Sequence, residues 1–427
     1  MKKLIVTVLM AVFVHSAFAQ SGTNSPYSQY GLGVLADQSQ GMSRGMNGLA
    51  YGFHERNQVN SVNPASYSAI DSLSFIFDAG LSAQITNFEE GGVKKNARNA
   101  DFEYVVAGFR AFKHVGVSFG LLPYTTVGYN FSNTGYVDNN RSTTYTNTFN
   151  GDGGLHQVYL GVGWEPLRGL SLGVNGSYLW GSYDRSVTSS YSDAYVNTLS
   201  KYYSADVASY KVDFGLQYTA RLTKKDQVTL GLTYSLGHKL GSDPECLVVS
   251  RNSQTGISDT TRYVVSDGLE IPKTVGAGLM WNHNNQLKVG VDYQLMKWSE
   301  TSFPLYQNVN GKAGYALNDQ AFSDRHKITL GGEYCKGGQS RMPRFYERIH
   351  YRAGISYATP YIKINGQDGP KELSASLGVG IPINRSMLNI SGQWVRQESD
   401  LFIKENTFRI NVGFTFNERW FAKFKVQ

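Results

Sequence analysis

The sequence predicts an all-β protein, a closed 14-stranded antiparallel transmembrane β-barrel, and three observations lead to this fold class. Apolar and polar residues alternate with a period of two in one segment after another, as they do in strands with one apolar face. Most of these segments are 9 to 12 residues long, close to the about 9–11 residues with which a tilted strand crosses a bilayer. The connections alternate between short and long, which is typical of outer-membrane barrels.

The composition of the 427-residue chain agrees with this class and excludes others. Charged residues make up 17%, below the about 25% of soluble domains, while 46 Gly, 28 Tyr and 22 Phe are unusually many. A hydrophobic fraction of 41% excludes a disordered chain. A bundle of membrane-spanning helices is excluded because no run of 18 apolar residues follows the first 20 residues. The two cysteines, Cys246 and Cys335, are too few for a disulfide framework.

The start of the chain has the features of a cleaved signal peptide. Lys2 and Lys3 precede an apolar run from Leu4 to Val14, and Ala17-Phe18-Ala19 fits an A-x-A cleavage site. We therefore expect residues 1–19 to be removed on export. An uncleaved anchor helix is the weaker alternative, because the apolar run is too short for a bilayer about 30 Å thick. The net charge is only +7 and the basic residues are scattered, so no nucleic-acid partner is expected.

The alternation is clear in individual segments. Between Leu287 and Leu295 every second residue is apolar, and the residues between them are Lys, Gly, Asp and Gln. A helix would instead need apolar residues three and four positions apart. Counting such runs predicts strands at residues 72–86, 101–112, 115–131, 155–165, 170–188, 207–221, 227–238, 274–282, 287–298, 326–335, 348–359, 372–382, 387–397 and 407–416.

The connections set the expected orientation and domain limits. The long connections, among them residues 132–154 and 189–206, should face outward, and the short ones should face the periplasm. The barrel then covers residues 72–416, and residues 417–427 form a periplasmic C-terminal tail. A soluble β-sandwich or propeller is the alternative for each run taken alone, but a propeller repeat of about 40 residues is not found.

Residues 20–71 precede the first predicted strand and lack its alternation. They contain Gly31-Leu32-Gly33, then Ser43-Arg44-Gly45-Met46-Asn47-Gly48, and finally Asn63-Pro64-Ala65 directly before the barrel. These motifs resemble the N-terminal hatch of the FadL-type transporters of long-chain fatty acids and aromatic hydrocarbons, and the chain is similar to a Bacteroidetes-like member of that family. The resemblance assigns hatch positions to Gly31, Gly33, Arg44, Gly45, Gly48, Asn63, Pro64 and Ala65.

The resemblance also implies a function. It implies passive uptake of small hydrophobic compounds, with a hatch that blocks the lumen and with lateral release into the membrane. The location would be the outer membrane of a Gram-negative bacterium. The partners would be outer-membrane lipid, lipopolysaccharide and a small apolar ligand, the chain would be a monomer, and no cofactor would be needed.

No motif of the sequence indicates catalysis. Gly31 to Ala36 fits G-x-G-x-x-A, but no strand precedes it, and a dinucleotide-binding loop needs strand, turn and helix in that order. Neither H-E-x-x-H nor G-x-S-x-G occurs. The alternative is a membrane-embedded hydrolase whose Ser, His and acidic groups come from different strands, because such an active site has no local sequence motif. We expect no enzymatic activity.

Charged residues on the polar faces of the predicted strands should point into the lumen. One interpretation is a mutually neutralising network that anchors the hatch, and the other is a polar permeation path. Unpaired charges in the lumen would be costly unless water reached them. The residues concerned are Lys211, Asp213, Lys288, Asp292, Glu333, Arg352 and Arg409.

Pro123 lies inside a predicted strand, where its missing N–H should break the ladder. The resemblance implies that a kink in this third strand opens a lateral gap in the wall, with Leu122, Pro123 and Tyr124 as the candidates. A bulge without function is the alternative.

A second function is also compatible with the predicted fold. The chain is similar to barrel subunits that accept cargo in the type IX secretion system of Bacteroidetes. In that case the barrel would accept or tether a secreted protein.

Overall fold

The computed structural model describes residues 22–137, 142–309, 312–338, 344–399 and 402–419. The predicted signal peptide, residues 1–19, lies outside these ranges, as do residues 420–427 of the predicted tail. No helix in the described part of the chain is long and apolar enough to cross a membrane.

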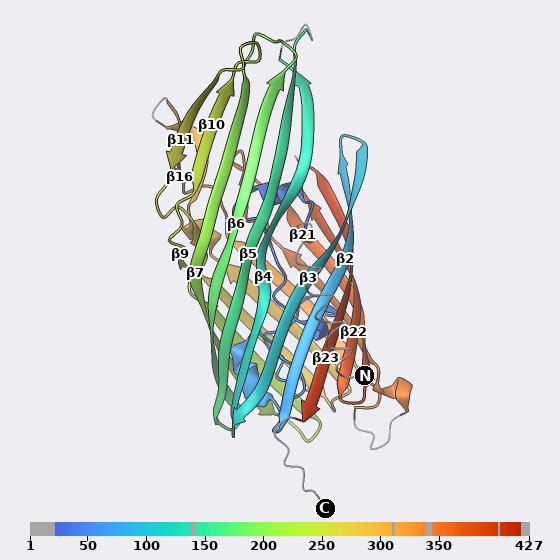
Figure 1. Ribbon diagram of the computed structural model, residues 1–427. Helices are drawn as coiled ribbons and strands as arrows, with labels where there is room; N and C mark the ends of the chain where they lie inside the picture. Colours follow the sequence, from blue (N-terminus) through green and yellow to red (C-terminus); the bar gives the residue numbers. More distant parts are fainter. Residues whose placement is uncertain (1–21, 138–141, 310–311, 339–343, 400–401, 420–427) are drawn as a thin grey trace, which may run out of the picture.

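Fourteen strands of the 17-stranded main sheet close into an antiparallel barrel (Figure 1). Each strand pairs with the next along the chain, and the last pairs with the first, which closes the barrel. The barrel strands are β2 (Ser74–Glu90), β3 (Val93–Phe112), β4 (Val115–Tyr136), β5 (Thr144–Leu167), β6 (Leu170–Tyr191), β7 (Thr198–Arg221), β8 (Asp226–Ser235), β13 (Thr274–His283), β14 (Leu287–Met296), β17 (Arg325–Tyr334), β18 (His350–Ala358), β21 (Lys371–Ile383), β22 (Ser386–Glu398) and β23 (Lys404–Arg419).

The prediction of a 14-stranded barrel is confirmed, and each predicted strand overlaps one barrel strand. The period of two has the expected cause. On β14, Val289 and Val291 are exposed on the outer face, whereas Lys288 and Asp292 are buried on the inner face. An apolar outer wall around a polar interior follows from this alternation.

Some predicted strand ends are wrong. β4, β5, β6 and β7 continue through most of residues 132–154 and 189–206, which were expected to be loops. Both faces of the strands are largely polar there, so the apolar period disappears although the backbone ladder continues. At the other end, β23 runs to Arg419, and residues 417–419 therefore belong to the barrel instead of the tail.

The extended strands form a sheet that projects beyond the barrel (Figure 1). It is widened by a hairpin of β10 (Glu245–Arg251) and β11 (Ser258–Val264), because β10 pairs with the first residues of β7. We call this end of the barrel the extended end and the opposite end the short-turn end.

The remaining elements are short. Three two-stranded ladders lie in the connections: β9 (His238–Lys239) with β12 (Glu270–Ile271), β15 (Phe303–Val309) with β16 (Lys312–Asn318), and β19 (Lys363–Ile364) with β20 (Gln367–Asp368). Short helices are η3 (Trp298–Glu300) and η4 (Phe345–Arg348). The residues before β2 contain η1 (Pro26–Gln29), β1 (Val34–Leu35), α2 (Gly41–Arg44) and η2 (Pro64–Ala69).

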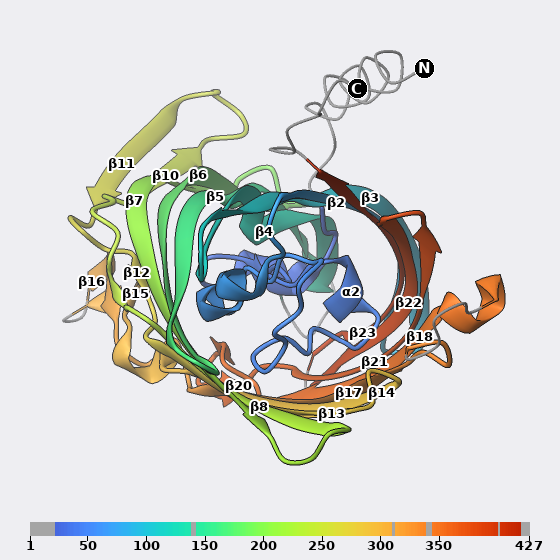
Figure 2. The ribbon, with the colours of Figure 1, turned by 90° about the horizontal axis from the view of Figure 1, so that it is seen from below.

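The N-terminal residues lie inside the ring of strands, where Figure 2 shows them in blue. We call residues 22–73 the luminal segment. Its apolar side chains join three buried clusters. The largest cluster combines Tyr27 and Leu32 of the luminal segment with inward side chains of β4 to β7 and with Trp298 and Phe322 from the connections of the extended end. The barrel is therefore filled and not hollow near that end.

Candidate functional site

Glycines on the inner wall make room for the luminal segment. Under η2 (Pro64–Ala69), a Cβ on Gly173 of β6 would collide with the backbone of Pro64. On the other side of the barrel, a Cβ on Gly354 of β18 would collide with Met46. Because a larger side chain at either position would push the segment off the wall, part of the high glycine content is explained by this close contact.

The Asn63-Pro64-Ala65 motif begins η2. The Asn63 side chain accepts a hydrogen bond from the Ala65 N–H at 3.2 Å, and so caps the helix. Its Nδ2 donates to the Tyr51 carbonyl at 2.9 Å. Pro64 occupies the first turn, where its missing N–H costs nothing. Ala65 is completely buried. The motif thus fixes where the luminal segment turns towards β2.

The predicted hatch glycines have two kinds of local role. Gly31, Gly33 and Gly48 have φ angles of +56°, +101° and +88°, a conformation that side chains disfavour. A Cβ on Gly33 would also lie 2.6 Å from the Thr126 carbonyl oxygen. Gly45 has an ordinary φ of −67° and instead ends α2, close against β18 and β21.

The barrel wall has a break between β3 and β4. Their ladder ends at the pair Val105–Leu121. Beyond this pair, β3 stays with β2 and β4 stays with β5, and the two hairpins diverge (Figure 1). The register of β4 against β5 shifts between Pro123 and Thr125, so that Tyr124 is the extra residue of a β-bulge. Leu122 and Tyr124 are buried.

The luminal segment covers the edge of β4 that β3 leaves open. β1 (Val34–Leu35) pairs antiparallel with this edge, opposite Thr126 and Thr125. Further along, the Ser28 hydroxyl exchanges hydrogen bonds with the backbone of Gly128, accepting from its N–H at 3.1 Å. An unpaired strand edge needs partners for its backbone groups, and here the protein's own N-terminal residues supply them.

The bulge itself is held in the same way. The Ala36 N–H donates to the Tyr124 carbonyl at 3.0 Å, and Gln38 Nε2 donates to the Pro123 carbonyl at 2.8 Å. The predicted lateral-gap residues and the predicted hatch therefore meet at one place.

On the opposite side of the break, the luminal segment is tied to β3. The Asn24 side chain donates to that of Asn99. The Arg44 guanidinium lies 2.7 Å from the Glu103 carboxylate, with both side chains buried, and 5.7 Å from the centre of the Tyr104 ring. Glu103 was missed by the sequence analysis. The N-terminal residues thus bridge β3 and β4 where these strands no longer touch.

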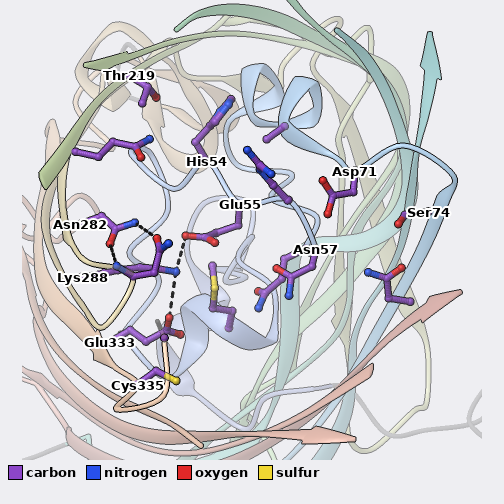
Figure 3. Close-up of a pocket in the computed structure, with 18 of the residues that line it drawn as sticks. His54, Glu55, Asn57, Asp71, Ser74, Thr219, Asn282, Lys288, Glu333 and Cys335 are labelled. Carbon is purple, nitrogen blue, oxygen red and sulfur yellow. Dashed lines mark hydrogen bonds and ion pairs between the residues drawn. The ribbon is translucent and has the colours of Figure 1, made fainter. Parts of the chain in front are cut away.

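Three of the seven predicted lumen charges meet in one buried cluster. Glu333 lies 3.2 Å from Lys288 and 2.7 Å from Arg352, and His350 is 3.1 Å away. Lys288 also contacts Glu55 of the luminal segment at 2.6 Å (Figure 3). The cluster therefore joins the wall to the luminal segment. Three of these five residues were predicted, whereas His350 was missed and the alternation of the strands does not apply to Glu55.

The other four predicted charges are separate from this cluster. Lys211 pairs with Asp213 at 2.5 Å on one face of β7. Arg409 donates to the Gln84 side chain at 2.7 Å. Asp292 accepts two backbone N–H groups of the luminal segment, at 2.6 and 3.0 Å. A single continuous network of all seven residues is therefore not present, although each of them faces the lumen.

A polar cavity of about 1580 Å³ lies at the short-turn end. Its wall includes the Glu55, Lys288 and Glu333 side chains, with His54 and Asp71 of the luminal segment on other sides (Figure 3). Towards the extended end, the lumen is closed by the luminal segment and by the large apolar cluster. Among the residues that the structure describes, no group of three or more His, Cys, Asp or Glu could hold a metal ion.

Comparison with solved structures shows which fold this is. The Pseudomonas putida toluene transporter TodX is 14% identical, with a TM-score of 0.61 over 91% of this chain and 100% of that chain. The Ralstonia pickettii toluene transporter TbuX is 14% identical, with a TM-score of 0.58 over 89% and 98%. A Pseudomonas aeruginosa FadL homologue is 11% identical, with a TM-score of 0.60 over 90% and 99%.

Sequence comparison gives the family. No curated protein matches the chain. The family model described as BamG matches residues 1–427. The chain therefore belongs to the BamG family, and its barrel has the fold of the FadL-type transporters.

Proposed function

We propose that the protein is an outer-membrane channel for the passive uptake of small hydrophobic compounds, in which the luminal segment is the gate and the break between β3 and β4 is the lateral exit. The observation that carries this proposal is the pairing of β1 with the edge of β4, inside the break. A barrel that only needed a stable wall would continue the β3–β4 ladder to the end of both strands.

The interior near the extended end suits apolar compounds. Its largest cluster is rich in aromatic rings, and the Trp298 ring lies tilted against those of Phe322 and Tyr361, with 5.0 Å and 5.3 Å between ring centres. Apolar molecules that enter from outside would be desolvated among these rings. The printed descriptions of TodX and TbuX as toluene transporters support the same class of substrate.

The luminal segment has to move for anything to pass. It occupies the space between the aromatic cluster and the break, and it supplies the backbone partners of β4 there. Displacing residues 22–38 would expose the edge of β4. The wall would then be open beyond the Val105–Leu121 pair, where the two hairpins diverge. The contact between β1 and the edge of β4 therefore closes both the lumen and the lateral exit.

The location in the outer membrane is part of the proposal. The exposed apolar outer face and the polar interior fit a barrel in lipid, with the short turns facing the periplasm. The predicted signal peptide would deliver the chain there, and lipid and lipopolysaccharide would surround it as a monomer.

A disulfide between the gate and the wall tests the proposal. Leu35 and Thr125 are direct partners in the β1–β4 ladder, and opposite residues of antiparallel strands have Cα atoms about 4.5–5.5 Å apart, within the range of a disulfide. In a chain that also carries Cys246→Ala and Cys335→Ala, Leu35→Cys with Thr125→Cys should lock the segment. Uptake of a labelled monoaromatic hydrocarbon should then fall to background when oxidised and recover on reduction.

The matched control places a disulfide away from the break. Leu279 and Val291 are direct partners in the β13–β14 ladder, both on the outer face. Leu279→Cys with Val291→Cys should leave uptake unchanged in both redox states. Equal uptake by the oxidised and reduced Leu35–Thr125 variant would overturn the gate.

The second candidate function is a barrel that accepts or tethers a secreted protein. It is favoured by the projecting sheet, in which β11 pairs only with β10 within the described residues and so presents a free edge. Such an edge can accept an extended peptide as a further strand. A purified barrel that retains apolar small molecules, detected by mass spectrometry, supports uptake, whereas one that retains a secreted protein supports this candidate.

A further inference from the structure

The polar cavity at the short-turn end, with its volume of about 1580 Å³, has a surplus of arginines. Six of them contribute to its wall: Arg56, Arg110, Arg168, Arg221, Arg348 and Arg385. In the described part of the chain, the arginines that form ion pairs are others, namely Arg44, Arg262, Arg325, Arg352 and Arg396. Neither the gate nor the exit proposed above depends on the six arginines of this wall.

The carboxylates of the cavity do not neutralise these arginines. Glu55 and Glu333 are both paired with Lys288 (Figure 3). Glu165 accepts a hydrogen bond from the backbone of its own β5–β6 turn. Asp71 is the one further acidic residue of the wall among the described residues. The cavity therefore has a net positive charge and attracts anions.

The arginines come from different sides of the barrel. Arg110 lies near the end of β3, Arg168 lies in the β5–β6 turn, and Arg221 is the last residue of β7. Arg385 lies in the β21–β22 turn, which other strands separate from β3 and from β7 around the ring. Arg56 belongs to the luminal segment. Because the cations stand around the wall, a single small anion would contact only some of them.

The cavity is accessible from the short-turn end, where Arg168, Arg221 and Arg385 are exposed. Arg110 is half-buried. Its Nη2 donates to the Ser68 carbonyl at 3.4 Å, whereas its Nε is buried without a hydrogen-bond partner among the described residues. A buried donor without an acceptor costs free energy, and an anion in the cavity would supply the acceptor.

The size and the amide groups of the cavity favour a peptide over a small anion. Sites for small molecules usually have volumes of about 300–1000 Å³, and this cavity is larger. Asn57, Gln227 and Asn384 also line it, and within the described residues their side chains form no hydrogen bond. Such amides can donate to and accept from a peptide backbone. Carboxylates suit the arginines, because a guanidinium binds a carboxylate with two parallel hydrogen bonds.

We propose that this cavity binds an acidic peptide segment of a periplasmic protein, with the carboxylates of the peptide on the arginines of the wall. The two ends of the chain are not candidates, since residues 1–19 and residues 420–427 each contain two lysines and no acidic residue. Because Arg56 belongs to the luminal segment, the partner would contact that segment from the periplasmic side. The periplasmic origin of the partner rests on the location and orientation proposed above.

Fluorescence anisotropy of a rhodamine-labelled hexaglutamate peptide tests the site on the full barrel in a neutral detergent. The wild type should bind this peptide better than hexaglutamine, and less tightly as the salt concentration rises. Arg168→Gln with Arg385→Gln removes two exposed cations from two turns and should weaken binding about tenfold. Lys224→Gln with Lys225→Gln is the matched control. It makes the same charge change in the exposed β7–β8 turn, outside the cavity wall, and should bind like the wild type.

Arg110→Gln tests the inner part of the cavity and should also weaken binding. Lys113→Gln, which removes an exposed cation just beyond the end of β3 and outside the cavity wall, should not. A benzophenone group on the peptide should crosslink to residues 165–169 and 382–387. Circular dichroism checks that each variant retains its β-structure.

Equal affinities of the wild type and both arginine variants, or crosslinks confined to the extended end, would overturn the site. Displacement of hexaglutamate by inorganic phosphate at the same concentration would assign the cavity to a small anion and overturn the peptide. Uptake is not part of this readout, so a barrel that binds no peptide leaves the channel proposal standing. A barrel that binds the peptide but takes up no hydrocarbon would refute the channel alone.

Discussion

The Arg44 guanidinium forms a buried ion pair with the Glu103 carboxylate, 2.7 Å apart, and so joins the end of α2 to β3 beside the break in the wall. Arg44 also donates from Nε to the Ser39 carbonyl at 3.0 Å and from Nη2 to the Asp37 carbonyl at 3.0 Å. One side chain thus organises the turn of the luminal segment and fastens it to the strand that β4 leaves. A substitution of Arg44 should therefore loosen the luminal segment without changing the barrel.

Replacing Arg44 should release the luminal segment. Arg44→Gln leaves the Glu103 carboxylate buried without its cation, and breaking a buried pair in this way costs about 3–5 kcal/mol. We expect faster hydrogen exchange of residues 34–44, while the strands of the barrel keep their protection. Arg98→Gln removes an exposed cation from the same strand as Glu103 and should change nothing. Unchanged exchange in Arg44→Gln would show that the pair does not hold the segment.

The glycine contacts predict a second, independent effect. Gly173→Val would drive a side chain into the backbone of Pro64, and overpacking of this kind costs about 1–3 kcal/mol or more. We expect a lower unfolding temperature and exposure of η2 to protease. Gly176→Val, three residues along the same strand, meets no atom within 4 Å and should unfold like the wild type. Equal unfolding temperatures would mean that η2 does not depend on this contact.

The barrel could be predicted from the sequence because lipid imposes a strong pattern. Residues such as Val289 and Val291 must be apolar outside, while Lys288 and Asp292 must be polar inside, and this contrast marks the strand. Beyond the membrane the contrast disappears. Thr134 of β4 and Thr146 of β5 face each other across the ladder with polar neighbours on both faces, so the projecting sheet was mistaken for loops.

The candidate site was harder to predict, for two physical reasons. The direction of a strand side chain follows from its position, so Glu333 and Arg352 could be placed in the lumen, but the partner across the lumen could not. The luminal segment has no period at all, so Glu55 gave no signal of its ion pair with Lys288. Glu103 lies on β3, but its partner Arg44 belongs to the luminal segment, and their ion pair therefore gave no signal either. Pro123 did indicate an irregular strand, although the contact of Gln38 with its carbonyl needed the structure.

The buried cluster around Glu333 should be far more important for stability than an exposed ion pair. Glu333→Gln leaves the buried cations of Lys288 and Arg352 without their shared carboxylate, which should cost about 3–5 kcal/mol. Glu300→Gln breaks the exposed pair with Lys273, in which both side chains are about half exposed, and should cost at most about 1 kcal/mol. Urea titration of the refolded barrel measures both, and equal midpoints would contradict the structural importance of the cluster.

The turn around Asp37 should make the luminal segment sensitive to acid. Burial raises the pKa of the Asp37 carboxyl. The Arg44 guanidinium, Lys327 and hydrogen bonds from Ser39 together lower this pKa by more than burial raises it, so it lies below its usual value. A carboxylate with a depressed pKa in the folded state stabilises that state above its unfolded pKa of about 3.9, and this stability is lost as the pH falls through the lower, folded pKa. The segment should therefore loosen below about pH 4 before the barrel unfolds.

Hydrogen exchange of residues 34–44, corrected for the intrinsic rate, should rise between pH 5 and pH 3 in the wild type and in the exposed control Asp71→Asn. In Asp37→Asn the protection should be weaker at pH 5 and should change less on acidification, because the group that titrates is gone; an equally steep pH response in that variant would assign the acid sensitivity to another carboxylate.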